Sequence, residues 1–158
     1  MQTIHAPWRI DYILAPKEKG CFLCVKRTRG FQRRHYILRE TAACYAMLNK
    51  YPYSAAHVMV VPKRHIADLD GFEPDELVDF ITLTRDTARI LKKAMGAHGL
   101  NLGANLGKEA GAGLEEHFHF HIVPRWNGDH NFMPVLGKTY VLPEYLDDTY
   151  ERLLPYFE

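Results

Sequence analysis

The strongest constraint on this chain is the segment His117–Val123, in which histidine alternates with apolar residues. Because neighbouring side chains of a β-strand point to opposite faces, a strand here would carry its three histidines on one face, about 6.6 Å apart. Phe118, Phe120 and Ile122 would face the other way and suit a core. The pattern predicts a strand that ends at Pro124 and presents its imidazoles to a site, because packing alone does not explain three histidines in register.

Further strands are expected on either side of one long helix, with bounds 36–38, 43–48, 57–61 and 101–106. Pro74 suits the first turn of the helix, and Gly96 suits its end. The apolar stripe expected to face a sheet is Leu77, Ile81, Thr84, Ala88 and Leu91. A shorter helix is expected within 143–156. Because the connections between strands are short enough for antiparallel pairing, the sequence predicts an α+β fold.

The length and charge of the chain limit its organisation and its partners. We expect one domain, 1–158, in which an irregular segment, 1–35, packs on the sheet. A formal net charge of +1 argues against binding nucleic acid by bulk charge, and the apolar runs are too short to cross a membrane. The first residues lack the apolar run of a signal peptide. We therefore expect a cytoplasmic protein with neither nucleic acid nor a membrane as partner.

Two chemical interpretations of the three histidines are open from the residues alone. In the first, all three bind one catalytic metal ion. A third ligand further along the same strand is awkward, however, because a tetrahedral ion holds its ligands at about 2 Å. In the second, one imidazole attacks phosphorus as a nucleophile and its neighbours position it. His119, the middle histidine, is best placed for that role.

The loop before the histidines is rich in glycine, at Gly107, Gly111 and Gly113. Such a loop lets backbone N–H groups surround an anion such as phosphate, although by itself it is more often only a turn. It lacks the Gly-Lys-Ser/Thr of a P-loop and leads into a strand, which excludes the P-loop and Rossmann interpretations. Beside a nucleophilic histidine, the loop favours phosphate chemistry.

The segment His117–Arg125, His-Phe-His-Phe-His-Ile-Val-Pro-Arg, resembles the signature of the histidine triad (HIT) superfamily of nucleotidyl hydrolases and transferases. Four other segments resemble one branch of that superfamily, the diadenosine tetraphosphate phosphorylases: Ala6–Arg9, Leu48–Tyr53, Ala110–His117 and Pro124–Asp129. The resemblance implies a HIT-like fold, a five-stranded antiparallel sheet with one long helix and a short C-terminal helix. It also implies a homodimer across which the sheet is extended.

The resemblance further implies roles for individual residues. His119 matches the nucleophile, which takes the adenylyl group from diadenosine tetraphosphate, releases ATP and passes the group to inorganic phosphate as ADP. His121 and His57 match residues that contact phosphate or hold the tautomer of the nucleophile. The implied substrate-binding positions are Asn49 at the ribose, Asn105, Gly111, Ala112 and Gly113 at the phosphates, and Trp126 on the substrate side. No organic cofactor is expected.

One departure separates this chain from many hydrolases of the superfamily. Those hydrolases carry Gly-Gln-Ser or Gly-Gln-Thr before the triad, where polar side chains assist the leaving group, whereas this chain has Ala112 and Gly113. The departure favours the phosphorylase branch over a hydrolase of dinucleoside polyphosphates or nucleoside phosphoramidates. A third hypothesis, of another class, is a nucleotide-binding sensor without significant turnover.

Cys21 and Cys24 form a Cys-x-x-Cys pair near the start of the chain. The pair alone is compatible with a turn that binds no metal, and a redox role needs a thioredoxin-like context that the sequence lacks. In zinc-containing members of the superfamily, the remaining ligands match His65 and His117. Two cysteines and two histidines make a closed, structural zinc site, which would fasten segment 1–35 to the histidine strand.

Overall fold

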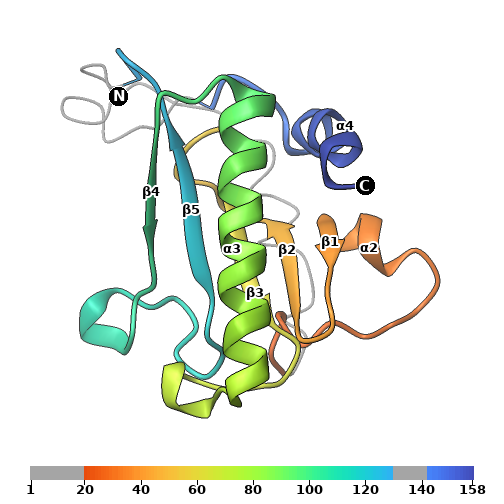
Figure 1. Ribbon diagram of the computed structural model, residues 1–158, viewed down its shortest axis with the longest axis vertical. Coiled ribbons are helices and arrows are strands. Elements are labelled where there is room, and N and C mark those ends of the chain that lie inside the picture. The colour runs from red at the N-terminus through yellow and green to blue at the C-terminus, as the bar shows by residue number, and fades with distance from the viewer. Residues whose placement is uncertain (1–19, 130–141) are drawn as a thin grey trace, which may run out of the picture.

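The computed structural model describes residues 20–129 and 142–158, which form an antiparallel sheet crossed on one face by a long helix (Figure 1). The five strands lie in the order β1-β2-β3-β5-β4, so β1 and β4 are its edges. Their bounds are β1 (Ile37–Glu40), β2 (Cys44–Leu48), β3 (Val58–Pro62), β4 (Gly99–Gly103) and β5 (Phe120–Arg125). The predicted α+β fold is confirmed.

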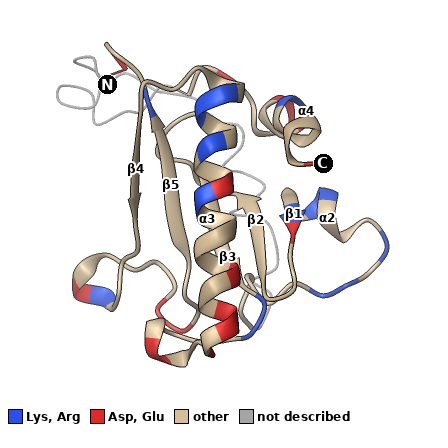
Figure 2. Ribbon diagram, in the orientation of Figure 1, with Lys and Arg blue, Asp and Glu red and all other residues tan. Residues whose placement is uncertain are grey.

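The helices are α2 (Phe31–Arg34), α3 (Pro74–Met95) and α4 (Leu146–Phe157), with 3-10 turns η1 (Leu69–Gly71) and η2 (Lys108–Ala110). A capping box begins α3: the carboxylate of Glu76 accepts the N–H of Glu73, and the Glu73 side chain accepts the N–H of Glu76. Gly96 ends α3 in the left-handed conformation, with φ of 58°. Acidic residues gather at the N-terminal end of α3 and basic residues at its C-terminal end (Figure 2), as the helix dipole favours.

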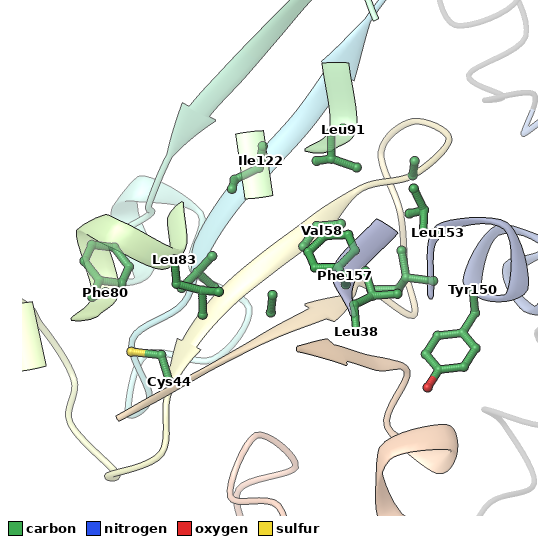
Figure 3. Packing of buried hydrophobic residues seen from close by; sticks show 14 of the residues in the cluster. Leu38, Cys44, Val58, Phe80, Leu83, Leu91, Ile122, Tyr150, Leu153 and Phe157 are labelled. Atoms are coloured by element: carbon green, nitrogen blue, oxygen red, sulfur yellow. The ribbon is translucent and has the colours of Figure 1, made fainter. Parts of the chain in front are cut away.

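The sheet is covered on both faces along β2 and β3, where every residue is buried. One core cluster lies between the sheet and the helices α3 and α4 and includes Phe80 and Ile122 (Figure 3). The other lies on the opposite face and joins Met59 to Leu23 of the N-terminal segment. His121 is the register partner of Met59, so it shares this second face. The histidine face of the sheet is therefore the face away from α3.

The histidine segment becomes a strand later than the alternation predicts. β5 begins only at Phe120, because the Phe118 N–H donates to the carbonyl of Ile66 at 2.6 Å, outside the strand ladder. The prediction that Pro124 ends the strand is wrong, since β5 runs on past it. The pairing of β5 with β3 stops at Ile122, so Pro124 pairs only with the edge strand β4 and its missing N–H breaks no central ladder bond.

The other predicted strands are confirmed with different bounds. The largest difference is at β4, expected over 101–106, which begins at Gly99 and ends at Gly103. It begins early because the N–H of His98 already donates to the carbonyl of Arg125 at 2.9 Å. The pairing with β5 therefore holds Gly99 in an extended backbone conformation.

The buried face of α3 is only in part the stripe that the spacing predicts. Thr84 and Leu91 are buried as expected, whereas Ile81 is 60% exposed. Its expected place is taken by Phe80, whose ring packs edge-on against Phe118 with centroids 5.6 Å apart. The buried residues of α3 are Phe80, Leu83, Thr84, Thr87 and Leu91. None of the helices within the described ranges combines the length and the apolar character that a membrane crossing requires.

Candidate active site

Two buried histidines from neighbouring strands meet on the face away from α3. His121 belongs to β5, and His57 lies just before β3, two residues ahead of Met59, the register partner of His121. His57 is 1% exposed and His121 is 8% exposed, and His57 Nε2 lies 2.9 Å from His121 Nδ1. The pairing of β3 with β5 thus joins two imidazoles that lie far apart in the sequence.

Hydrogen-bond donors fix the tautomers of this pair. The backbone N–H of Tyr53 donates to His57 Nδ1 at 3.1 Å, so in neutral His57 the hydrogen is on Nε2. His57 Nε2–H then donates to His121 Nδ1, which places the hydrogen of neutral His121 on its own Nε2. This Nε2 is buried and has no hydrogen-bond partner among the described residues. A buried donor without a partner indicates a place where a ligand completes the site.

His119 is held in the tautomer of a nucleophile. Its Nδ1 lies 2.8 Å from the carbonyl oxygen of His117, and a carbonyl can only accept, so Nδ1 carries the hydrogen. The lone pair of His119 is therefore on Nε2. The ring is half-buried and lies edge-on to His121, with centroids 5.0 Å apart. A neutral imidazole in this state can attack an electrophilic phosphorus.

Burial keeps the paired histidines uncharged. Loss of hydration lowers the pKa of His57 from 6.5 to about 3, and repulsion from the charges that His121 and His119 would carry adds to this. The pKa of His121 is lowered to about 4, again first by burial and then by His119. Both imidazoles are therefore neutral near pH 7, and the tautomers above are the relevant ones.

Asn49, at the end of β2, is built into the same site. Its N–H donates to the carbonyl of His57 at 2.9 Å, and its side-chain amide nitrogen lies 3.4 Å from His57 Nδ1. Its side-chain oxygen accepts the N–H of Tyr51 at 2.9 Å. The structure therefore brings this predicted ribose-binding residue next to the histidine pair.

The glycine-rich loop leaves the sheet at the histidine end. Gly103, the last residue of β4, is the register partner of His121, and Asn105 follows two residues later. Within the loop, Gly111 has φ of 89° and the N–H of Ala112 donates to the carbonyl of Gly107 at 3.2 Å. Gly113 lies in the exposed part of the loop, shortly before the histidines. The predicted phosphate-binding positions thus begin beside His121.

Trp126 is not brought to the histidines within one chain. It follows β5 at the end away from His119, about 16 Å along the strand from His121. Its indole N–H donates to the carbonyl of Met95 at 3.0 Å, at the C-terminal end of α3. In the single chain Trp126 therefore packs on the helix end.

A second cluster lies beside the first and contains the four residues that the resemblance to the superfamily implied as zinc ligands. The ligand atoms of Cys21, Cys24, His65 and His117 all lie within 4.8 Å of one another. His117 Nδ1 is 3.2 Å from the Sγ atom of Cys21, and His65 Nδ1 is 3.2 Å from that of Cys24. Tetrahedral zinc holds sulfur at about 2.3 Å and nitrogen at about 2.0 Å. Its ligand atoms therefore lie a few ångström from one another, as these sulfur and nitrogen atoms do.

The tautomer of His117 also fits a metal ligand. Its Nε2–H donates to the carbonyl of Pro62 at 2.9 Å, so the lone pair of neutral His117 is on Nδ1 and faces the cysteines. The side chains of the three histidines therefore divide: His117 joins the cysteine pair, while His121 joins His57. Among the described residues no metal-binding group contains all three, which favours the nucleophile interpretation.

The HIT domain model matches residues 31–128, which span the sheet, α3 and all three histidines. This chain belongs to the HIT domain family. The match begins after Cys21 and Cys24, so the cysteine pair lies outside the part by which the family is recognised.

Known HIT domain proteins resemble this chain over much of its length. It is 44% identical to the AP-4-A phosphorylase of Mycobacterium tuberculosis (strain ATCC 25618 / H37Rv), over 98% of this chain and 83% of that protein. It is 32% identical to the asymmetrical bis(5'-nucleosyl)-tetraphosphatase of Schizosaccharomyces pombe (strain 972 / ATCC 24843), over 59% of this chain and 50% of that one. A Zn-bound histidine triad family protein from Mycobacterium smegmatis shares the fold, with a TM-score of 0.64, 24% identity and coverage of 78% and 84% of the two chains.

Tyr53 is the site residue that the sequence did not single out. The sequence marks it only as the end of the segment Leu48–Tyr53 that resembles the phosphorylase branch, whereas its backbone N–H sets the tautomer of His57. Every residue except proline has an N–H, so no sequence pattern marks the one that will meet an imidazole.

Proposed function

We propose that this HIT domain protein is a nucleotidyltransferase that cleaves diadenosine tetraphosphate with inorganic phosphate to give ADP and ATP. The observation that carries the proposal is the state of His119, with its hydrogen held by the His117 carbonyl and its lone pair on Nε2. The resemblance to AP-4-A phosphorylase over nearly the whole chain supports this substrate and this acceptor.

The reaction follows from the tautomers. His119 Nε2 attacks the α-phosphorus of the substrate; an N–P bond forms and the bond from that phosphorus to the bridging oxygen breaks, which releases ATP. The positive charge of the adenylyl-histidine is stabilised by the hydrogen bond from Nδ1 to the His117 carbonyl. Inorganic phosphate then attacks the same phosphorus, breaks the N–P bond and leaves as ADP. His121 Nε2–H is the donor for the phosphoryl oxygens during both steps.

The substrate-binding residues are proposed by position. Asn49 beside His57 would take the ribose, and the loop with Asn105 and Gly111, Ala112 and Gly113 would surround the phosphates through backbone N–H groups. Trp126 lies too far from His119 in one chain, so its role on the substrate side requires the dimer that we propose next.

We further propose that two copies pair along β4. This strand is an edge of the sheet, and an unpaired edge is a natural place for a strand from another chain. Leu102 on β4 shares the α3-covered face with its register partner Ile122, yet it is 48% exposed. A second copy would cover Leu102 and continue the sheet.

Zinc is the metal that we propose for Cys21, Cys24, His65 and His117. Two thiolates and two imidazoles match the ligand preference of zinc, and a site with four protein ligands has no open position for catalysis. The metal would therefore supply cohesion to the fold. Thiols that must stay reduced to bind it suit the cytoplasm, which is the location we propose.

Product analysis with labelled phosphate tests the function. Incubation of diadenosine tetraphosphate with labelled inorganic phosphate should give labelled ADP and unlabelled ATP, with no cleavage when phosphate is omitted. Equal formation of AMP and ATP without phosphate would make the protein a hydrolase. The name of the Schizosaccharomyces pombe relative, a tetraphosphatase, states such an activity.

A His119→Ala variant separates the two enzymes from a sensor. We expect turnover to fall at least about 10⁴-fold, because covalent catalysis needs this nitrogen, while nucleotide binding is retained. If the wild-type protein and the variant bound nucleotide and showed the same negligible turnover, a non-catalytic nucleotide-binding sensor would be the correct description.

A further inference from the structure

The turn between β2 and β3 is built around His57. The carbonyl of His57 accepts the Asn49 N–H at 2.9 Å, and its Nδ1 accepts the Tyr53 N–H at 3.1 Å. Just before His57, Ala56 has φ of 53°, a left-handed conformation that residues other than glycine seldom adopt. Such a conformation persists where surrounding contacts determine it. The turn therefore holds His57 both through its backbone carbonyl and through its ring.

The ring of Tyr53 lies against both buried imidazoles. Its centroid is 4.7 Å from that of His57 and 5.6 Å from that of His121, with interplanar angles of 40° and 42°. The two histidines are almost fully buried, whereas Tyr53 is 56% exposed. The tyrosine ring is thus a layer between the histidine pair and the solvent on this side.

We propose that Tyr53 is a positioning residue for the transfer reaction, because its ring keeps water away from the hydrogen bond between His57 and His121. A water molecule at this bond could donate to His121 Nδ1 or accept from it, so either tautomer of His121 could form, whereas the N–H of residue 53 would still hold that of His57. With water excluded, the donors at His57 Nδ1, which are the Tyr53 N–H and the Asn49 side-chain amide, determine that the hydrogens lie on both Nε2 atoms. The role in catalysis rests on the proposed function, since the tautomer matters to the reaction only if His121 Nε2–H donates to the phosphoryl oxygens.

The electrostatics of the pair agree with a water-excluding cover. Burial is the first cause that lowers the pKa of both His57 and His121, and the titratable groups that act on them are histidines: His121 and His119 on His57, and His119 on His121. Removing the cover lets water hydrate the charged form. The pKa of each imidazole then rises toward its ordinary value.

Histidine ¹⁵N NMR spectra of the full-length protein test the proposal without any substrate. In the wild type and in Tyr53→Phe, which keeps the ring, we expect one neutral tautomer of His57 and of His121, with the hydrogen on Nε2. In Tyr53→Ala we expect signals of mixed tautomers of His121 and protonation of the pair at higher pH. Tyr51→Ala is the matched control, because Tyr51 lies in the same turn, is 57% exposed and also donates its N–H to a site residue.

Two outcomes would overturn the proposal. One is a Tyr53→Ala spectrum in which His121 keeps the wild-type tautomer and the pair keeps the wild-type titration. The other is an equal change in Tyr51→Ala, which would assign the effect to the turn rather than to the ring. Because Tyr53→Phe removes only the hydroxyl group, loss of the tautomers in that variant would also contradict shielding by the ring.

Kinetics test whether the shielding serves the reaction. In Tyr53→Ala we expect kcat to fall about tenfold, a part of what a positioned proton donor contributes, while KM changes less than about twofold. In Tyr53→Phe both should stay at wild-type values. A large rise in KM with kcat unchanged would instead make Tyr53 a contact for the nucleoside. If the wild type does not turn over diadenosine tetraphosphate, the proposed function fails, and the NMR spectra still decide the tautomer claim.

Discussion

His117 takes part in both clusters of this protein through different atoms. Its imidazole Nδ1 lies 3.2 Å from Cys21 Sγ, while its carbonyl oxygen accepts the Nδ1–H of His119 at 2.8 Å. The same residue thus lies in the proposed zinc site and fixes the tautomer of the proposed nucleophile. At the scale of single residues, the site depends on which nitrogen of each imidazole carries a hydrogen.

The first prediction at this scale concerns stability against pH. The folded-state pKa values of His57 and His121, about 3 and about 4, lie below the ordinary 6.5, so below pH 6.5 the unfolded chain binds more protons than the folded one. Stability is therefore full above pH 6.5 and falls as pH decreases. Each histidine should cost about 2 kcal/mol of unfolding free energy between pH 6.5 and about pH 5.

Urea unfolding at several pH values measures this dependence, with His57→Gln as the comparison. The glutamine variant should have a shallower fall, because one of the two titrating imidazoles is gone. Identical pH slopes for the wild type and the variant would show that His57 is not held neutral by the fold.

At the scale of elements, short segments are fixed by contacts with distant parts of the chain. The N-terminal segment 20–35 has little regular structure, yet Leu23 and Phe31 are buried against the sheet. Cys21 and Cys24 from the same segment meet His65, which follows β3, and His117, which precedes β5. The proposed zinc would therefore tie three parts of the fold together.

Replacing Cys21 tests this tie. In Cys21→Ser we expect metal analysis to fall from about one zinc per chain to well below that, because a closed site needs all four ligands. Hydrogen exchange in segment 20–35 should become faster. Cys44→Ala is the control, since Cys44 is buried in the other core cluster and should leave the zinc content unchanged. Full zinc retention in Cys21→Ser would contradict the assignment.

The start of α3 gives a second prediction for an element. The carboxylate of Glu76 accepts the Glu73 N–H and two N–H groups of Arg64, at 2.6 to 2.9 Å. We expect Glu76→Ala to lower the unfolding free energy by about 1 kcal/mol, the usual cost of losing a cap. Asp75→Ala, in the same turn, should cost only about 0.3 kcal/mol through the helix dipole. Denaturant unfolding measures both, and equal losses would contradict the capping role.

At the scale of the whole molecule, the sheet has two edges with different surroundings. At β1, the Tyr150 hydroxyl of α4 donates to the carbonyl of Ile37 at 3.1 Å, so this end is covered by the chain itself. At β4, Leu102 is half-exposed although it shares the side of the sheet that α3 covers. The difference points to β4 as the edge that a second copy would cover.

A lysine at this edge tests the dimer. We expect the wild type to sediment as a dimer and Leu102→Lys to sediment as a monomer, because a charge would be buried in the contact. Tyr156→Lys on α4, also at an exposed hydrophobic position, should remain dimeric. A monomeric wild type, or a dimeric Leu102→Lys, would contradict pairing along β4.

The sequence by itself determined the fold class and most of the strand that carries His121. It could do so because strand periodicity and the order of the motifs are local properties of the chain. His119 and His121 lie within one short segment, so their nearness followed from the sequence, although β5 begins only after His119. The cysteine pair and its two histidine partners followed from the resemblance to the superfamily.

Only the tertiary structure decided which histidine joins the cysteine pair and which one joins His57. The pairing of β3 with β5 brings His57 to His121, and the turn brings the Tyr53 N–H and ring to His57. The exposure of Ile81 and the continuation of β5 past Pro124 likewise depend on which neighbours cover them. Tautomers and burial are set by contacts between distant segments, and those contacts exist only once the sheet has formed.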